Sequence, residues 1–349
     1  MNKLIRYIYS LICMLCCMIG MLFITSCHSD DSPADSGAIR LVFRIYMPTA
    51  TTQSRAAEGT DEGDEWESAI NPSKLHVVLY SSDDKNIGAL ENVVLVRTSD
   101  PNVYDVTGSM LLSKLLLEDG IFNGQIMVYA NMDGVNDSND FDESLVNQLT
   151  FNRNAGEHYI PMWGIKRLNV SLVAGKQSDI GTINLLRAEA KVKVDLRQDM
   201  TANLEMTKVV LTQANASGYC LPRYENLKGL QDVQLLEHEA FIHFLGTEPK
   251  QKNLDMGNQA IYVPEYDNQD AAQATCIQLT LRDKRDGKTT DYTLPFVEYD
   301  ADGAPTSSPV DIVRNHYYHF IVYKGDDGMV SVRLTVRKWY YVQHDNIQM

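Results

Sequence analysis

The sequence predicts a mainly β protein with two β-sandwich domains and a few short helices. Short segments rich in Val, Ile and Tyr recur along the chain, and Asn, Asp and Gly turns separate them. Only two segments have helical spacing, and both are too short to form the crossovers of a parallel, doubly wound sheet. The length of 349 residues allows roughly two or three domains.

The chain opens with a leader. Lys3 and Arg6 precede an apolar run over residues 8–24, and Thr25-Ser26-Cys27 follows. A charged start, an apolar core and small residues before a cut site indicate a secretory signal. The cysteine fits the lipobox of bacterial lipoproteins, in which Cys27 becomes the acylated first residue. The alternative is an uncleaved signal anchor, because the run is close to membrane-spanning length. Both interpretations tether the chain to a membrane, outside the cytoplasm.

Net charge and cysteine content limit the classes of function that the chain can have. The chain has 31 basic and 46 acidic residues, a net charge of −15, and removal of residues 1–26 leaves 29 basic residues and a charge of −17. Such an acidic body excludes nucleic-acid binding, which needs a basic face. It also leaves the acyl chains as the expected membrane contact. Beyond Cys27 only Cys220 and Cys276 remain, and they form either one disulfide or two buried thiols.

The first half of the mature chain begins with a Ser- and Asp-rich linker, residues 27–38, and continues as a predicted domain over 39–187. Between residues 49 and 64 no strand pattern is present, which predicts an exposed loop. Helical spacing occurs at 110–116 and 141–149. The predicted strands are Ile39–Met47, Lys74–Tyr80, Asn92–Arg97, Gly124–Ala130, Leu168–Val173 and Asp179–Leu186.

The second half is a predicted domain over 188–349. Its predicted strands are Ala190–Leu196, Lys208–Thr212, Ala260–Val263, Cys276–Leu281, Tyr317–Tyr323 and Met329–Arg337. In the last of these, apolar residues alternate from Val330 to Val336. The alternation slips at Trp339, as it would at a β-bulge or where a separate tail begins.

The sequence contains no motif for nucleophilic catalysis or for phosphate or dinucleotide binding. His238 and His243 are five residues apart, a spacing that brings two imidazoles together neither on a helix nor on a strand. Asp300 and Asp302, before a glycine, begin like a calcium loop but lack the later ligands. Tyrosine pairs are more often cross-strand packing than a sugar-binding surface. We therefore expect no enzyme activity, no metal and no cofactor.

A series of short strings follows the Cys27 lipobox in a characteristic order. They are Leu41–Tyr46, Thr51–Ala56, Tyr129–Asn131, Ile160–Gly164, Leu185–Val192, Ile261–Glu265 and Val313–Tyr318. In this order the chain resembles the fimbrillin superfamily of Bacteroidales, whose members are lipoprotein precursors of cell-surface pili. The resemblance spans residues 27 to about 340. It implies two transthyretin-like antiparallel β-sandwich domains, an outer-membrane location through the lipid on Cys27, and other pilus subunits as partners.

The resemblance also implies assembly by donor-strand exchange. In that mechanism a protease cuts after an arginine behind the first strand, the strand leaves, and a segment of the next subunit enters its groove. The matching position is Arg55, followed by Ala56. Arg40 and Arg44 compete with it but lie inside the predicted first strand, where a protease has poor access.

The donor candidate is the C-terminal tail. It places Trp339, Tyr341, Ile347 and Met349 on one face, interrupted by Gln343 and Asp345. The alternative is a last strand packed in its own domain, and a shaft, anchor or tip position within the pilus stays open. The rival function is a non-polymerising surface lipoprotein that binds a glycan or a host or bacterial surface ligand through its β-sandwich.

Overall fold

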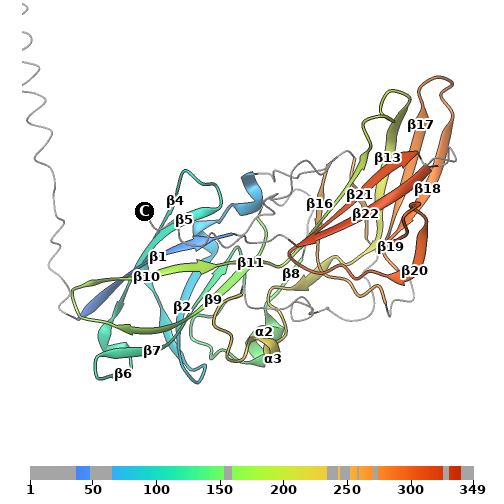
Figure 1. Cartoon of the computed structure of the whole chain (residues 1–349). Helices are drawn as coiled ribbons and strands as arrows, with labels where there is room; N and C mark the ends of the chain where they lie inside the picture. Colours follow the sequence, from blue (N-terminus) through green and yellow to red (C-terminus); the bar gives the residue numbers. More distant parts are fainter. Residues whose placement is uncertain are drawn as a thin grey trace, which may run out of the picture.

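The computed structural model describes residues 37–47, 65–152, 159–233, 243, 252–257, 259–269, 274–324 and 330–338. Over these residues the chain is mainly β, with few short helices, which confirms the predicted fold class (Figure 1). Within the same residues no helix is both long enough and apolar enough to cross a membrane.

The first half of the chain forms two sheets. One has the order β10-β1-β5-β4, and the other has the order β11-β9-β7-β2-β3 with β6 beside β7. Side chains such as Phe43, Val77, Val106 and Ile126, each 1% exposed or less, belong to their common core. The strands are β1 (Ala38–Tyr46), β2 (Leu75–Ser81), β3 (Asn86–Ala89), β4 (Glu91–Arg97), β5 (Val103–Leu111), β6 (Leu117–Glu118), β7 (Ile121–Ala130), β9 (Met162–Ser171), β10 (Gln177–Asn184) and β11 (Leu186–Arg187).

The second half repeats the arrangement with a core of its own. Its two sheets have the orders β16-β12-β21-β22 and β15-β13-β17-β18. Val192, Leu211, Ile277 and Phe320 belong to the core cluster that both sheets line. The strands are β12 (Ala190–Leu196), β13 (Leu204–Ala214), β15 (Lys252–Asp255), β16 (Ile261–Val263), β17 (Cys276–Asp283), β18 (Thr289–Pro295), β21 (His316–Lys324) and β22 (Val330–Lys338), with a small hairpin of β19 (Val297–Tyr299) and β20 (Pro305–Pro309).

A segment of the second half packs on the first. β14 (Ser217–Tyr219) pairs with β8 (Thr150–Asn152), and α3 (Tyr224–Leu227) lies near α2 (Glu143–Gln148). Buried residues from Cys220 to Val233 belong to one apolar cluster with Trp163 and its neighbours in the first half. The predicted domain boundary after residue 187 stays a prediction, and part of the chain beyond it covers the first half.

One of the two predicted helices is confirmed. Residues 143–148 form α2, and Asp142 caps it by accepting a hydrogen bond from the backbone N–H of Leu145 at 2.8 Å. The prediction of a helix over 110–116 is wrong, because β5 continues to Leu111 and only a 3-10 turn, η3 (Leu112–Lys114), follows. Met110 is 1% exposed and extends the alternating buried face of β5, so core packing overrides the local helical spacing.

Two pairings depart from a purely antiparallel arrangement. β1 runs parallel to β10, and β12 runs parallel to β21. On their other edges β1 and β12 pair with antiparallel strands, β5 and β16, so the first strand of each half lies inside its sheet rather than at an edge.

Candidate functional site: the first strand and its groove

The first strand, β1, is hydrogen-bonded along both edges. Its antiparallel register with β5 runs from Ala38 opposite Leu111 to Tyr46 opposite Val103. On its other edge the parallel pairing with β10 begins at Arg40. Loss of this strand would therefore leave two facing rows of unpaired backbone donors and acceptors, which an incoming extended segment can satisfy.

One face of β1 fills the core with apolar side chains. Ile39, Leu41, Phe43, Ile45 and the following Met47 are each 1% exposed or less. Alternation of this kind is what a strand with one buried face requires. Removal of β1 would therefore leave an apolar groove between β5 and β10, of a shape that fits alternate side chains of an extended chain.

On the opposite face of β1 the two arginines are exposed, and the side chains between and beside them are half-buried. Arg44 Nε lies 3.0 Å from Asp105 Oδ1 on β5, and the two side chains are 65% and 51% exposed. An ion pair this open to water contributes little to stability. Arg40 and Arg44, the sequence's competitors to Arg55, both lie within the hydrogen-bonded strand.

Backbone hydrogen bonds also hold the two ends of β1. Where β1 starts, the Gly175 N–H donates to Ala38 O at 2.7 Å. Just beyond its end, the Met47 N–H donates to Asn102 O at 3.0 Å. All nine residues of the strand thus lie between two hydrogen-bonded ends.

The segment η1 (Glu65–Ser68) is tied to the second half by a buried ion pair. Lys191 Nζ on β12 lies 2.6 Å from Glu67 Oε1, with side chains 2% and 5% exposed. The Tyr262 hydroxyl donates to the same carboxylate, and Arg187 Nε donates to Glu67 O at 3.2 Å. Buried charges require partners of this kind, so these contacts specify one position for η1.

The same segment also contacts the end of the groove. Ser68 Oγ donates to Asn102 Oδ1 at 2.6 Å, and the Tyr104 hydroxyl donates to Ser68 O at 3.1 Å. Tyr104 is opposite Ile45 in the β1–β5 register. η1 therefore links the groove to β12, and its anchoring contacts lie on β5 and on the second half.

These anchoring residues were not predicted from the sequence. Arg187, Glu189 and Lys191 are charged residues at alternate positions leading into an apolar strand, and all three are 2% exposed or less. Arg187 ends β11, Glu189 lies in the bend that follows, and Lys191 lies on β12. Three charged residues at the junction of two predicted apolar strands are the signal that could have indicated a buried polar contact.

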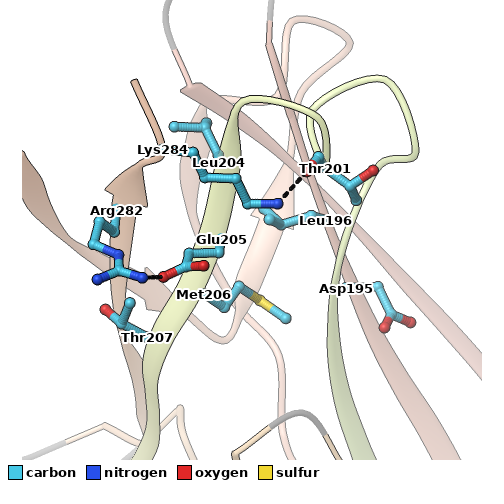
Figure 2. A pocket seen from close by; sticks show the side chains of 9 residues that line it. All are labelled: Asp195, Leu196, Thr201, Leu204, Glu205, Met206, Thr207, Arg282 and Lys284. Atoms are coloured by element: carbon cyan, nitrogen blue, oxygen red, sulfur yellow. Dashed lines mark hydrogen bonds and ion pairs between the residues drawn. The ribbon is translucent and has the colours of Figure 1, made fainter. Parts of the chain in front are cut away.

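The second half has an open depression of about 620 Å³ between β12 and β13 (Figure 2). Its charged side chains have partners within the protein: Arg282 pairs with Glu205, and Lys284 Nζ donates to Thr201 O at 2.7 Å. Burial raises the pKa of Asp195, but hydrogen bonds from His319 and Lys193 outweigh it and hold the pKa below its usual range. The depression thus presents compensated charges rather than a reactive group.

His243 and the acidic motif at Asp300 have structural explanations, whereas His238 lies outside the described residues. His243 stacks on Tyr219, and its Nδ1 lies 2.9 Å from Leu221 O. Burial lowers its pKa, which favours the neutral ring. Asp300 Oδ1 accepts backbone hydrogen bonds from Asp302 and Ala304 at 3.0 and 2.9 Å, so it caps its own turn. Within the described residues no cluster of His, Cys, Asp and Glu fits a metal ion.

The two remaining cysteines are free thiols. Cys220 is buried and Cys276 is half-buried, and no disulfide joins them. Burial raises the pKa of Cys220 to about 12. The sequence left open one disulfide or two thiols, and in the structure both cysteines are thiols.

The residues predicted as sites lie outside the described part of the chain. These are the lipidation site Cys27, the cleavage pair Arg55 and Ala56, and the tail residues Trp339, Tyr341, Ile347 and Met349. Their roles stay predictions. Along the chain, Arg55 comes after β1, and the tail begins directly after β22, which ends at Lys338.

Comparison with known proteins identifies the family. The model of the fimbrillin-A associated anchor proteins Mfa1 and Mfa2 matches residues 107–345, from within β5 to beyond β22. No curated protein matches the chain significantly.

Solved structures with a similar fold include two fimbrial proteins. A fimbrilin from Porphyromonas gingivalis W83 is 15% identical, with a TM-score of 0.49, over 87% of this chain and 99% of that one. A fimbrial assembly protein from Parabacteroides distasonis ATCC 8503 is 13% identical, with a TM-score of 0.47, over 86% and 99%. Because the family model matches more than half of its length, the chain belongs to the family of fimbrillin-A associated anchor proteins Mfa1 and Mfa2.

Proposed function

We propose that the chain is a structural pilus subunit, exported as a lipoprotein on Cys27 and assembled by donor-strand exchange after cleavage behind Arg55. Membership of the family supports a fimbrial role at the cell surface and association with other pilus subunits. Strand exchange is supported by the position of β1 inside its sheet, where it is paired on both edges and buries apolar side chains on one face.

The energetics of the groove favour exchange over an empty state. Burial of each large apolar side chain of β1 contributes about 1.5–3 kcal/mol, and four such side chains fill the groove together with Met47 just beyond the strand. An empty groove would lose this stabilisation together with two rows of hydrogen bonds. It therefore refills with β1 or with another strand of the same alternation.

Cleavage gives the exchange its direction. While β1 is part of the chain, it competes for the groove at an effective concentration that is typically in the millimolar range. A cut in the loop after Met47 turns β1 into a separate peptide and removes this advantage. η1, which follows the loop, remains anchored through Glu67 and Lys191.

Protease treatment of the purified acylated precursor tests the proposal. An arginine-specific protease is expected to produce a new N-terminus at Ala56 and to start SDS-resistant ladders. Arg55→Ala should resist both steps. Arg44→Ala is the matched control, because it removes an arginine within β1, and it should be cut as the unmodified chain is.

Removal of the tail separates cleavage from donation. A chain that ends at Lys338 should still be cut at Arg55 but should form no ladder, because the donor segment is missing. If the cut protein stays a stable monomer at every concentration, polymerisation is excluded. Glycan-array binding by that monomer would then support the rival function of a ligand-binding surface lipoprotein.

A further inference from the structure

Exposed apolar side chains gather at one tip of the first half. Leu111, Leu116, Ile121 and Val173 are 36%, 78%, 40% and 46% exposed. They are half of the large apolar side chains that stand out as exposed in the described residues, the others being Val94, Val96, Tyr159 and Val336. Single exposed apolar residues need no explanation, whereas a cluster of them marks an interaction surface.

Backbone contacts place this cluster around the start of β1. Leu111 is opposite Ala38 in the β1–β5 register, and the Gly175 N–H donates to Ala38 O at 2.7 Å. Ile121 is opposite Glu118 in the hairpin that joins β6 to β7. Figure 1 shows β6 and the beginning of β1 together at the lower left of the molecule. We call residues 37–38, 111–121 and 172–176 the apolar tip.

The apolar tip also differs from the rest of the protein in charge. It contains two basic residues, Lys114 and Lys176, and two acidic residues, Glu118 and Asp119. Lys114 Nζ lies 3.1 Å from Glu91 Oε1 on β4, just outside the tip. The mature chain as a whole carries 17 more acidic than basic residues, so the tip avoids the repulsion from anionic surfaces that the remaining body would meet.

We propose that the apolar tip rests on the lipid bilayer that holds the acylated Cys27. This inference depends on the lipoprotein part of the proposed function. Only ten residue steps separate Cys27 from Gly37, a length that spans at most roughly 35 Å when fully extended. The tip is therefore the part of the described structure that the lipid holds closest to the membrane. At that proximity a modest apolar surface makes contact, because the tether supplies a high effective concentration.

This contact orients the cleavage loop. β1 has nine residues, and at about 3.3 Å per residue it places its far end roughly 30 Å from the tip. Met47, from which the chain continues towards Arg55, is at that far end. With the tip on the bilayer, the chain leaves β1 on the side away from the membrane, where a protease has access.

Tryptophan scanning with brominated lipid tests the contact. The acylated protein is reconstituted on phosphatidylcholine vesicles with and without brominated acyl chains, as Leu116→Trp and as Val96→Trp. Val96 is a matched control because it is apolar, 56% exposed and on the same half. It is opposite Asp105, six residues along β5 from Leu111, which is about 20 Å.

The expected result is selective quenching. Once the signal of the unmodified protein is subtracted, bromine should lower the emission of Leu116→Trp roughly twofold and leave Val96→Trp unchanged, since a membrane-surface contact inserts side chains to about 5–10 Å. If neither variant is quenched while both still float with the vesicles, the tip contact is wrong and the lipid anchor stands. Blue-shifted emission without quenching would mean that a second copy covers the tip, which also overturns the proposal.

The anchor is checked separately. Cys27→Ala should lose the acyl mass and should no longer float with the vesicles. If this variant floats as the unmodified protein does, the lipidation assigned to Cys27 fails, and the tip contact that depends on it fails as well.

Discussion

β1 and β12 occupy equivalent places in the two halves of the molecule. Each is the first strand of its half, and each lies between a parallel partner and an antiparallel partner: β10 and β5 for β1, and β21 and β16 for β12. They differ in what they bury. β1 buries only apolar side chains, whereas β12 also buries Lys191, paired with Glu67.

This difference bears on the strand exchange that we propose for β1. Any extended segment with alternating apolar residues would satisfy the chemistry of the space that β1 fills. A replacement for β12 would also have to supply a cation, because Glu67 would otherwise lose its buried ion pair with Lys191. The same topology therefore gives β1 a purely apolar buried face and gives β12 a charged contact with the first half.

Breaking the buried ion pair should produce the largest effect. Lys191→Met leaves Glu67 buried without its cation and should lower the free energy of unfolding by about 3–5 kcal/mol. The double variant Glu67→Leu and Lys191→Met should recover much of that loss. Urea unfolding measures both, and a single variant within about 0.5 kcal/mol of the unmodified chain would contradict the role given to this pair.

Matched leucines compare the removable strand with the second half. Leu41 on β1 and Leu211 on β13 are both fully buried. Each change to alanine should cost the intact precursor about 2–5 kcal/mol. After cleavage and strand exchange, the cost of Leu41→Ala should disappear because β1 has gone, while that of Leu211→Ala should persist. If Leu41→Ala lowers the stability of the cleaved protein as much as that of the precursor, β1 has stayed in its groove.

Thiol labelling reports on the contact between the halves. Cys220 packs against the first half and Cys276 lies in the second, so native protein should label at Cys276 roughly a hundredfold faster. Comparable labelling rates at the two cysteines would argue against a close contact between the halves.

The pKa of Cys220 makes stability depend on pH. Burial raises the folded pKa of this thiol from 9.0 to about 12. The unfolded thiol therefore ionises first, and stability should fall as pH rises above about 9. Cys220→Ala should remove the part of the decline that begins near pH 9 and leave the part that buried tyrosines such as Tyr80, whose pKa is raised to about 12, add at higher pH.

The exposed ion pair on β1 should matter least. Arg44→Ala removes a pair whose side chains are 65% and 51% exposed, and such pairs contribute about 0–1 kcal/mol. The free energy of unfolding should change within that range. The small contribution of this ion pair, which salt screens, should disappear. A loss comparable to that of Lys191→Met would mean that polar contacts fix β1 as firmly as they fix β12.

Much of the fold follows from local alternation. Every second residue from Ile39 to Met47 is apolar, and in the structure these residues form the buried face of β1 and its end. The Cys27 lipobox and the ordered strings likewise indicated the family that the comparison identifies. The helix over 110–116 was predicted wrongly because spacing of three and four residues also fits an apolar strand that runs into a turn.

The sequence by itself determined which residues of strands such as β1 face the core. Tertiary structure alone decided that β1 lies between β10 and β5, because β10 follows it by more than 130 residues and parallel pairing has no local turn to specify it. Glu67 and Lys191, separated by 124 positions, likewise become partners only on folding. The physical reason is the same in both cases. Alternation specifies a face, whereas a partner across the sheet or across the two halves depends on which distant surfaces meet.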